Sequence, residues 1–172
     1  VPTESPVPTE TPVPTETPVP TETPVPTESP APSGTPYPYA KVVGDVWVVP
    51  EFQTVKNGDT FNVNIHVHCG TENLVAYGIG ITYDENKLTA IDVAAGPDGF
   101  LTAINTNTPG RIFAVGFTIG GTVTGPDIDL LVITFTAINL HYSSIDIQVD
   151  TLVNEYSETI GPETPREGIG GG

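Results

Sequence analysis

The segment FNVNIHVHC, residues 61–69, decides the fold of this chain. Apolar side chains occupy its odd-numbered positions, and polar side chains occupy the even-numbered positions between them. Successive side chains of a β-strand point to opposite faces, so the pattern predicts a strand with one face in a core and the other in solvent. The polar face carries two histidines, His66 and His68.

The same two-residue period recurs along the chain and predicts further strands. Their expected inward residues are Val75, Tyr77, Ile79, Ile81 and Tyr83; Phe113, Val115, Phe117 and Ile119; Leu131, Ile133, Phe135 and Ala137; and Ile145, Ile147 and Val149. Turn sequences rich in Gly, Pro, Asn and Asp separate these runs, for example at residues 57–59, 96–99 and 125–127. No stretch shows a sustained helical period. The sequence therefore predicts an all-β fold, a two-sheet antiparallel β-sandwich.

Residues 1–36 repeat a six-residue unit, VPTETP and its variants, with two prolines in each unit. Proline removes a backbone donor and pushes the preceding residue toward extended geometry, so the repeat predicts a disordered or polyproline II spacer. We expect a Pro/Thr-rich linker at 1–38, a β-sandwich domain at 39–162 and a Gly/Pro-rich tail at 163–172. Such repeats are typical of secreted, often O-glycosylated linkers, which predicts a secreted protein, one that could be attached to a cell surface.

Charge and cysteine content restrict the partners of this chain. The formal net charge is −16, and Lys41, Lys56, Lys87 and Arg111 are the only bases between residues 37 and 162. Such a chain is poorly suited to displace counterions from phosphate, so neither nucleic acid nor membrane insertion is predicted. Cys69 is the only cysteine and stands in an apolar run, where we expect a buried, unpaired thiol.

No catalytic motif is visible, because the chain lacks the GxSxG, HExxH and P-loop patterns, and an enzyme is not predicted. His66 and His68 share a strand face, which suits a divalent metal. Asn62 and Asn64 share that face too, which favours an ordinary solvated surface. The acidic segment 127–129 lacks the full ligand spacing of a calcium loop. Neither a metal nor a cofactor is therefore predicted for this chain.

Two of the expected strands carry very small residues on the face opposite their inward set. These residues are Ala76, Gly78, Gly80 and Thr82 on one strand, and Ala114, Gly116 and Thr118 on the other. Glycine within a strand often marks the close approach of another backbone or a ligand. If the two strands are neighbours, their outer faces form a flat docking platform. Alternatively, the glycines accommodate twist or lie beneath a loop of the same domain.

Several segments resemble the cohesin family, whose members are jelly-roll modules of scaffoldins and surface-anchoring proteins. The segment NGDTFNVNI at 57–65 is similar to the family's glycine–aspartate–threonine turn and the strand that follows. The segment AYGIGITYDENKL at 76–88 is similar to the family's strand that ends in tyrosine–aspartate, a turn residue and leucine. Residues 90–93 and 130–138 resemble the next short strand and a late apolar strand. Together these segments cover most of residues 42–160.

The resemblance implies a non-catalytic receptor that binds a dockerin, a small helical module whose calcium ions belong to the partner. The family's binding face corresponds here to the strands at 75–83, 101–107 and 111–119. The residues expected to contact the partner are Ala76, Gly78, Gly80, Thr82, Asn105, Asn107, Ala114, Gly116 and Thr118. In the best-known class of the family, asparagine and aspartate occupy the positions of Ala76 and Gly78. This difference implies another specificity class or an atypical partner.

Two other functions remain open at this point. A carbohydrate-binding module needs exposed aromatic rings in a planar row. Trp47 lies among apolar neighbours, and Tyr142 and Tyr156 are near strand ends. A structural or adhesin domain of a surface layer needs no ligand, and it would be favoured if the domain's own loops covered the small-residue face. Residues 161–172 predict no closing strand, although the family closes its sandwich with one.

Overall fold

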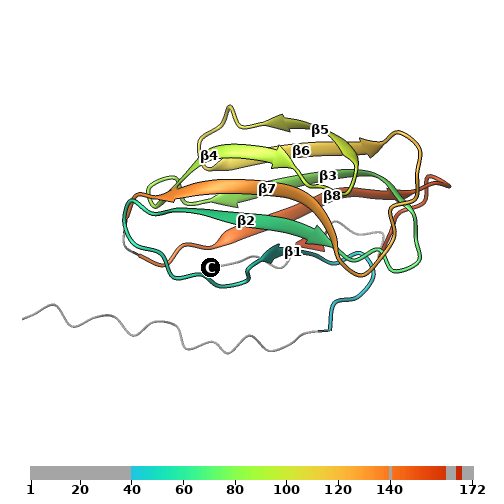
Figure 1. The fold of residues 1–172 in the computed structure, drawn as a ribbon, viewed down its shortest axis with the longest axis horizontal. Coiled ribbons are helices and arrows are strands. Elements are labelled where there is room, and N and C mark those ends of the chain that lie inside the picture. Colours follow the sequence, from blue (N-terminus) through green and yellow to red (C-terminus); the bar gives the residue numbers. More distant parts are fainter. Residues whose placement is uncertain (1–39, 140, 162–165, 168–172) are drawn as a thin grey trace, which may run out of the picture. The chain divides into compact units, whose positions relative to one another are not determined.

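The computed structural model describes residues 40–139, 141–161 and 166–167, which form an all-β fold (Figure 1). The prediction of an all-β sandwich is confirmed. The expected linker at 1–38 and all of the expected tail except residues 166–167 lie outside the described residues. No helix that could cross a membrane is found in the described part of the chain.

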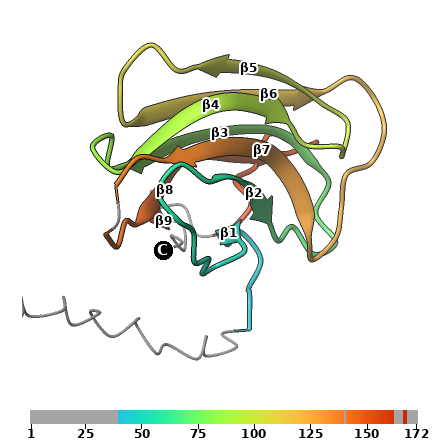
Figure 2. The same ribbon diagram turned by 60° about the vertical axis from the view of Figure 1, so that its left-hand side comes forward.

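Nine strands form in the described residues. They are β1 (Val46–Val49), β2 (Thr60–Val67), β3 (Leu74–Tyr83), β4 (Leu88–Ala95), β5 (Phe100–Asn105), β6 (Arg111–Thr118), β7 (Ile128–Ala137), β8 (Ile145–Asn154) and β9 (Arg166–Glu167). One sheet has four strands in the order β1-β2-β7-β4, and the other has five in the order β5-β6-β3-β8-β9. Each pair of neighbouring strands is antiparallel. Figures 1 and 2 show the sheets as two facing layers.

The core between the sheets consists mainly of the inward residues that the alternation predicts. Ile65 of β2, Ile133 of β7 and Ile79 of β3 have no exposed surface and belong to one hydrophobic cluster. Full burial of such a side chain stabilises the fold by about 1.5–3 kcal/mol. A register slip of one residue would turn every one of these side chains to solvent, so the pattern fixes the register of each strand.

Cys69 has the buried environment that the sequence predicts. The residue is fully buried and its thiol is unpaired. Burial, with a smaller contribution from the charge of Glu72, raises the pKa of the thiol to about 12. The thiol is therefore neutral and unreactive at physiological pH, as expected for a structural cysteine.

Strand β6 contradicts the prediction that was made for it. The expected inward residues of this run are exposed by 43, 42, 54 and 73 %, for Phe113, Val115, Phe117 and Ile119 respectively. Ile112 and Ala114, from the other phase of the alternation, are fully buried instead. The prediction of the inward face of β6 is thus wrong, although the prediction of a strand is right.

The phase of β6 is set by Tyr77 on the neighbouring strand. Tyr77 is buried and lies opposite Gly116 in the β3–β6 register, and a Cβ on Gly116 would stand 2.2 Å from the tyrosine ring. The ring also makes an edge contact with Phe100, with centroids 5.1 Å apart. Its hydroxyl lies 2.9 Å from the Thr102 hydroxyl and donates to the Leu130 carbonyl at 3.2 Å. Because Tyr77 fills this part of the core, only small residues fit beside it on β6.

The two-residue strand β9 is a further difference from the sequence analysis, which predicts no strand after Ile160. Arg166 pairs with Val149, and Glu167 pairs with Gln148. Backbone pairing over two residues requires no hydrophobic pattern, so the sequence carries no signal for it. The pairing places β8 between β3 and β9.

Candidate functional site

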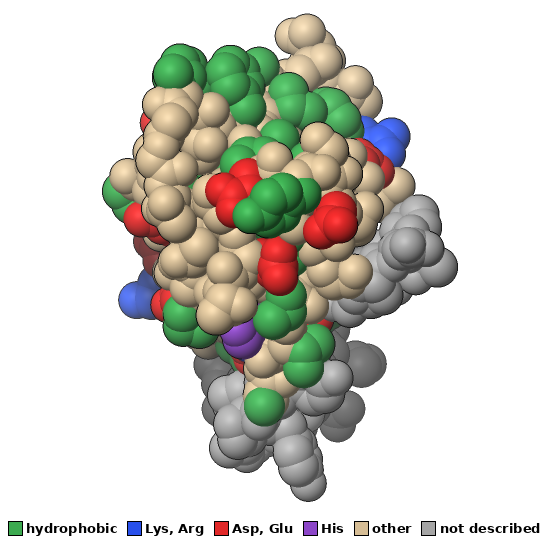
Figure 3. Space-filling model, turned by 90° about the vertical axis from the view of Figure 1, so that its right-hand side faces the viewer, with side chains coloured by type: hydrophobic (Ala, Val, Ile, Leu, Met, Phe, Trp, Pro, Cys, Tyr) green, Lys and Arg blue, Asp and Glu red, His purple; other side chains and the backbone are tan. Residues whose placement is uncertain are grey.

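The outer face of β5 and β6 carries a row of large apolar side chains. Leu101 lies opposite Phe117, and Ala103 lies opposite Val115. Leu101 is 51 % exposed, comparable with its neighbours on β6. We define the apolar strip as Leu101, Phe113, Val115 and Phe117. Figure 3 shows hydrophobic side chains along the edge of the molecule over β5 and β6. Contiguous exposed apolar surface of this kind marks interaction sites.

Beside the apolar strip, β3 presents its small residues outward, as the sequence predicts. Gly78 lies opposite Val115, and Gly80 lies opposite Phe113. A Cβ on Gly78 would stand 3.6 Å from Thr151 and 3.7 Å from Val115, which is ordinary contact. The two glycines, which we call the glycine floor, therefore lie low between taller side chains of β6 and β8.

The far border of the glycine floor is polar and acidic. Strand β8 exposes Asp146, Gln148, Asp150 and Thr151, which we define as the polar strip. The register with β3 passes from Thr151 directly to Val149, so Asp150 forms a β-bulge. The Gln148 amide donates to the Asp150 carboxylate at 3.0 Å. The bulge and this bond account for two consecutive exposed residues, Asp150 and Thr151, in an otherwise alternating strand.

One end of this face carries charges of both signs. Thr82 of β3 lies between Arg111 of β6 and Asp146 of β8. The Ser144 hydroxyl donates to the Asp146 carboxylate at 3.2 Å. Arg111 is the only base on this face among the side chains that the structure describes.

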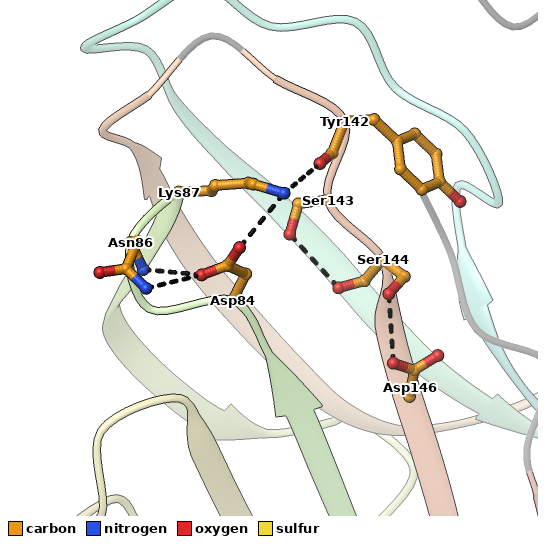
Figure 4. A network of polar contacts seen from close by, with 7 residues as sticks. All are labelled: Asp84, Asn86, Lys87, Tyr142, Ser143, Ser144 and Asp146. Carbon is orange, nitrogen blue, oxygen red and sulfur yellow. Dashed lines mark hydrogen bonds and ion pairs between the residues drawn. The ribbon is translucent and has the colours of Figure 1, made fainter.

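The loops at this end are joined by a network of polar contacts (Figure 4). The Lys87 ammonium lies 3.2 Å from the Asp84 carboxylate and donates to the Tyr142 carbonyl at 2.8 Å. The backbone and the amide of Asn86 donate to the same carboxylate at 3.0 and 3.1 Å. These donors, the Asn86 backbone first, lower the pKa of Asp84. The network holds the β3–β4 turn against the loop that precedes β8.

Most of the residues expected to contact a partner lie at this face. The outward residues of β3, namely Ala76, Gly78, Gly80 and Thr82, are where the sequence placed them. Asn105 ends β5 on the same side, opposite Phe113, and accepts from the backbone of Asn107 at 2.9 Å. Asn107 is exposed in the loop that follows.

Three expected contact residues of β6 require correction. Ala114 is fully buried, Gly116 lies against the Tyr77 ring, and Thr118 lies opposite the buried Phe100. All three belong to the inner face, and at Gly116 the Tyr77 ring leaves no room for a side chain.

The sequence did not predict the apolar strip or the polar strip as contact surfaces. A signal for the apolar strip exists in the pairing of Tyr77 with Gly116, since opposite residues of neighbouring strands share a face. Once Tyr77 is assigned to the core, Gly116 must follow, and Val115 and Phe117 must then face outward. The bulge at Asp150 has no comparable sequence signal.

His66 of β2 and His68, just after the strand, are held by protein groups. Nδ1 of His66 contacts the Asp127 carboxylate, and Nε2 lies 3.9 Å from the Asp129 carboxylate. Nδ1 of His68 lies 3.1 Å from the Lys41 carbonyl. Within the described ranges, no three His, Cys, Asp or Glu side chains are grouped so that they could hold a metal ion.

Asp129 occupies a partly desolvated position on the outer face of the four-stranded sheet. The Asn64 amide donates to Oδ2 at 2.6 Å, while Oδ1 is buried without a hydrogen-bond partner. Burial raises the pKa of the Asp129 carboxyl, and the bond from Asn64 and the His66 imidazole oppose this rise.

The three aromatic residues considered for a sugar, Trp47, Tyr142 and Tyr156, do not form a planar row. Trp47 is buried, with its ring centroid 5.8 Å from that of His66 and 5.3 Å from the Lys41 ammonium. Tyr142 and Tyr156 are exposed, but one precedes β8 and the other follows it. The ten residues of β8 separate these two by about 33 Å.

The fold and this surface define a β-sandwich interaction module. The chain belongs to the cohesin family, because the family model described as "Cohesin domain" matches residues 46–162. Cohesins are non-catalytic modules that bind other proteins, so the predictions of a non-enzyme and of the family are confirmed. No curated protein sequence matches the chain.

Solved cohesin structures share this fold. The Clostridium acetobutylicum cohesin CaCohA2, in complex with a variant of the dockerin CaDoc0917, is 22 % identical, with a TM-score of 0.57 over 70 % of this chain and 92 % of that chain. The cohesin module of a Clostridium perfringens family 33 glycoside hydrolase is 15 % identical, with a TM-score of 0.57 over 74 % and 96 %. A non-cellulosomal cohesin from Archaeoglobus fulgidus is 14 % identical, with a TM-score of 0.53 over 68 % and 82 %.

Proposed function

We propose that this chain is an extracellular receptor module that docks a dockerin-type partner through the outer face of β5, β6, β3 and β8. The observation that carries the proposal is the apolar strip, whose four side chains are about half exposed on regular strands. The similar cohesins from Clostridium acetobutylicum, Acetivibrio cellulolyticus and Clostridium thermocellum were solved in complex with dockerins, which supports this class of partner.

The physical case for docking rests on desolvation and rigidity. A partner that covers the apolar strip gains about 25 cal/mol for each Å² of apolar surface removed from water. The strip and the glycine floor belong to paired β-strands, so little conformational entropy is lost when they bind. Gly78 and Gly80 carry no side chain and are buried between the side chains of β6 and β8, so a partner would rest mainly on the two strips that flank them. The apolar strip and the polar strip are exposed on both sides of the buried glycine floor, which favours a binding face over a purely structural domain.

Calcium in such a complex would belong to the partner. Dockerins are expected to carry calcium in their loops, as the family resemblance implies, and the contacts proposed for the receptor face need no calcium on this chain. Binding would then depend on calcium through the partner's fold, and the stability of this chain would not.

The proposed location is outside the cell, with the Pro/Thr repeat of residues 1–36 as a spacer. In polyproline II conformation a segment of this length reaches on the order of 100 Å. A tethered receptor searches a limited volume, so the effective concentration of a captured partner would depend on the length of the spacer.

The test is capture of secreted proteins from the source organism on the immobilised chain, in calcium and in EDTA, followed by calorimetry with each purified dockerin. We expect saturable, calcium-dependent binding by at least one dockerin. The melting temperature of the chain alone should not change with EDTA, which assigns the calcium to the partner. Absence of binding by every dockerin encoded with the chain would falsify the proposal.

A further inference from the structure

We propose that the docking face binds apolar side chains of its partner over the apolar strip and basic side chains over the polar strip. These two different contacts fix the orientation of the partner. The inference rests on the proposed function and specifies the partner's surface. The occupant is a helix, with an apolar flank and a basic flank, of a calcium-loaded dockerin.

The apolar side of this face is free of charge along most of its length. Leu101 with Phe117, and Ala103 with Val115, form adjacent cross-strand pairs of exposed apolar side chains. Polar side chains stand only at one end, where Asn105 ends β5 and the exposed Arg111 begins β6. A charged side chain of a partner placed over this strip would lose its hydration without gaining a counter-charge.

The polar side presents carboxylates that have no basic partner among the described side chains. Asp146 is bonded to the neutral Ser144 hydroxyl, and Asp150 is bonded to the neutral Gln148 amide. Both carboxylates are exposed. Exposed carboxylates attract cations, and the net charge of −16 strengthens the field that draws a basic partner toward them.

The spacing of the two strips fits one helix. Strand β3 separates β6 from β8, so the strips are two strand spacings apart, about 10 Å. An α-helix with its side chains is about 10–12 Å across. A helix that lies on the glycine floor, over Gly78 and Gly80, would therefore contact β6 with one flank and β8 with the other. Turned end for end, the same helix would place its basic flank over Phe117 and Val115.

The experiment measures affinity for the dockerin that binds most tightly in the calorimetric panel, at low and at high salt. Phe117→Ser should lower the affinity by about tenfold or more at both salt concentrations, because it removes an apolar anchor. The double variant Asp146→Lys/Asp150→Lys should lower the affinity by about tenfold at low salt, and this loss should shrink at high salt as the charges are screened.

Matched controls come from β4 of the other sheet. Ile91 is 57 % exposed and Asp92 is exposed, so Ile91→Ser and Asp92→Lys repeat the same chemical changes away from the face. Both control variants should bind within about twofold of the wild type, as expected for residues outside an interface. Asp146→Asn, which removes one charge without adding another, keeps the test valid if the double variant unfolds.

The outcomes separate this inference from the function on which it rests. Affinity that is unchanged in both the apolar and the charge variants overturns the two-part recognition and leaves dockerin binding in place. A charge variant that loses affinity equally at all salt concentrations also overturns it. If the wild type binds no dockerin, both proposals are wrong. Restored binding when a basic residue of the dockerin helix is changed to Asp against the Asp146→Lys/Asp150→Lys variant supports the proposed orientation.

Discussion

The outer faces of the two sheets belong to one sandwich, yet they differ in the kind of side chain that they expose and in whether those side chains contact one another. On the four-stranded sheet the polar groups pair with one another. Asn64 donates to Asp129 at 2.6 Å, and the hydroxyls of Thr60 and Thr136 lie 3.3 Å apart. On the five-stranded sheet the four apolar side chains of the apolar strip are left open. The first face is suited to water and the second to a partner.

This difference originates in the core. Both faces come from strands with a two-residue period, so local pattern alone does not distinguish them. The Tyr77 ring fills the space under β6 at Gly116, where a Cβ would stand 2.2 Å from the ring, so this phase of β6, with Ile112 and Ala114, faces the core. The large apolar residues of β6 are consequently placed outside. The exposed apolar strip, the proposed docking surface, is thus a consequence of how one tyrosine packs.

The largest expected effect concerns the inner side of β6. Gly116→Val should lower the free energy of unfolding by about 3 kcal/mol, because a Cβ there would stand 2.2 Å from the Tyr77 ring and the core would have to shift. Urea denaturation of wild type and variant measures the change. A loss below about 1 kcal/mol would mean that Gly116 is not in the core and that β6 faces the other way.

A smaller effect is expected on the polar face. Asn64→Ala should cost about 2 kcal/mol near neutral pH, because the partly buried Asp129 carboxylate loses its amide donor. The cost should decrease in acid, where a protonated Asp129 needs the donor less. Equal costs at both pH values in chemical denaturation would contradict this description of the face.

The pH dependence of stability gives a third, weaker test. Burial raises the pKa of Asp129 in the folded chain, so folding penalises its ionised form. The penalty is absent below the ordinary pKa of about 4 and is complete above the raised pKa. Wild type should therefore lose stability relative to Asp129→Asn as the pH rises from about 4 to neutrality, by no more than about 1 kcal/mol. A relative gain in stability over that range is the contrary outcome.

The smallest effect is expected on the glycine floor. Gly78→Ala should change the free energy of unfolding by less than about 0.5 kcal/mol, since its Cβ would meet Thr151 and Val115 at ordinary contact distances. Thermal or chemical unfolding beside Gly116→Val makes the comparison direct. Similar losses in both variants would show that the two glycines do not lie on opposite faces.

The sequence predicts most of the fold and part of the site, and the reasons can be given residue by residue. The inward sets of β2, β3, β7 and β8 are read correctly because large apolar and polar residues alternate there. On β6 the residues of both phases are apolar or small, so the inward face was predicted from side-chain size alone. This criterion placed Phe113 inward, which is wrong. The choice required the pairing of Tyr77 with Gly116, which is tertiary information. The bulge at Asp150 likewise depends on pairing with β3, and no local sequence motif predicts it.

The most direct test of the central claim is a nuclear magnetic resonance titration of the isotope-labelled chain with its calcium-loaded dockerin. If the face of β6 is the docking surface, the backbone amide shifts should be concentrated on β3, β5, β6 and β8, with the largest near Val115, Phe117 and Gly78. Residues of β1, β2, β4 and β7 should remain nearly unshifted. Shifts concentrated on that four-stranded sheet, with the apolar strip unaffected, would contradict the claim that the exposed face of β6 is the docking surface.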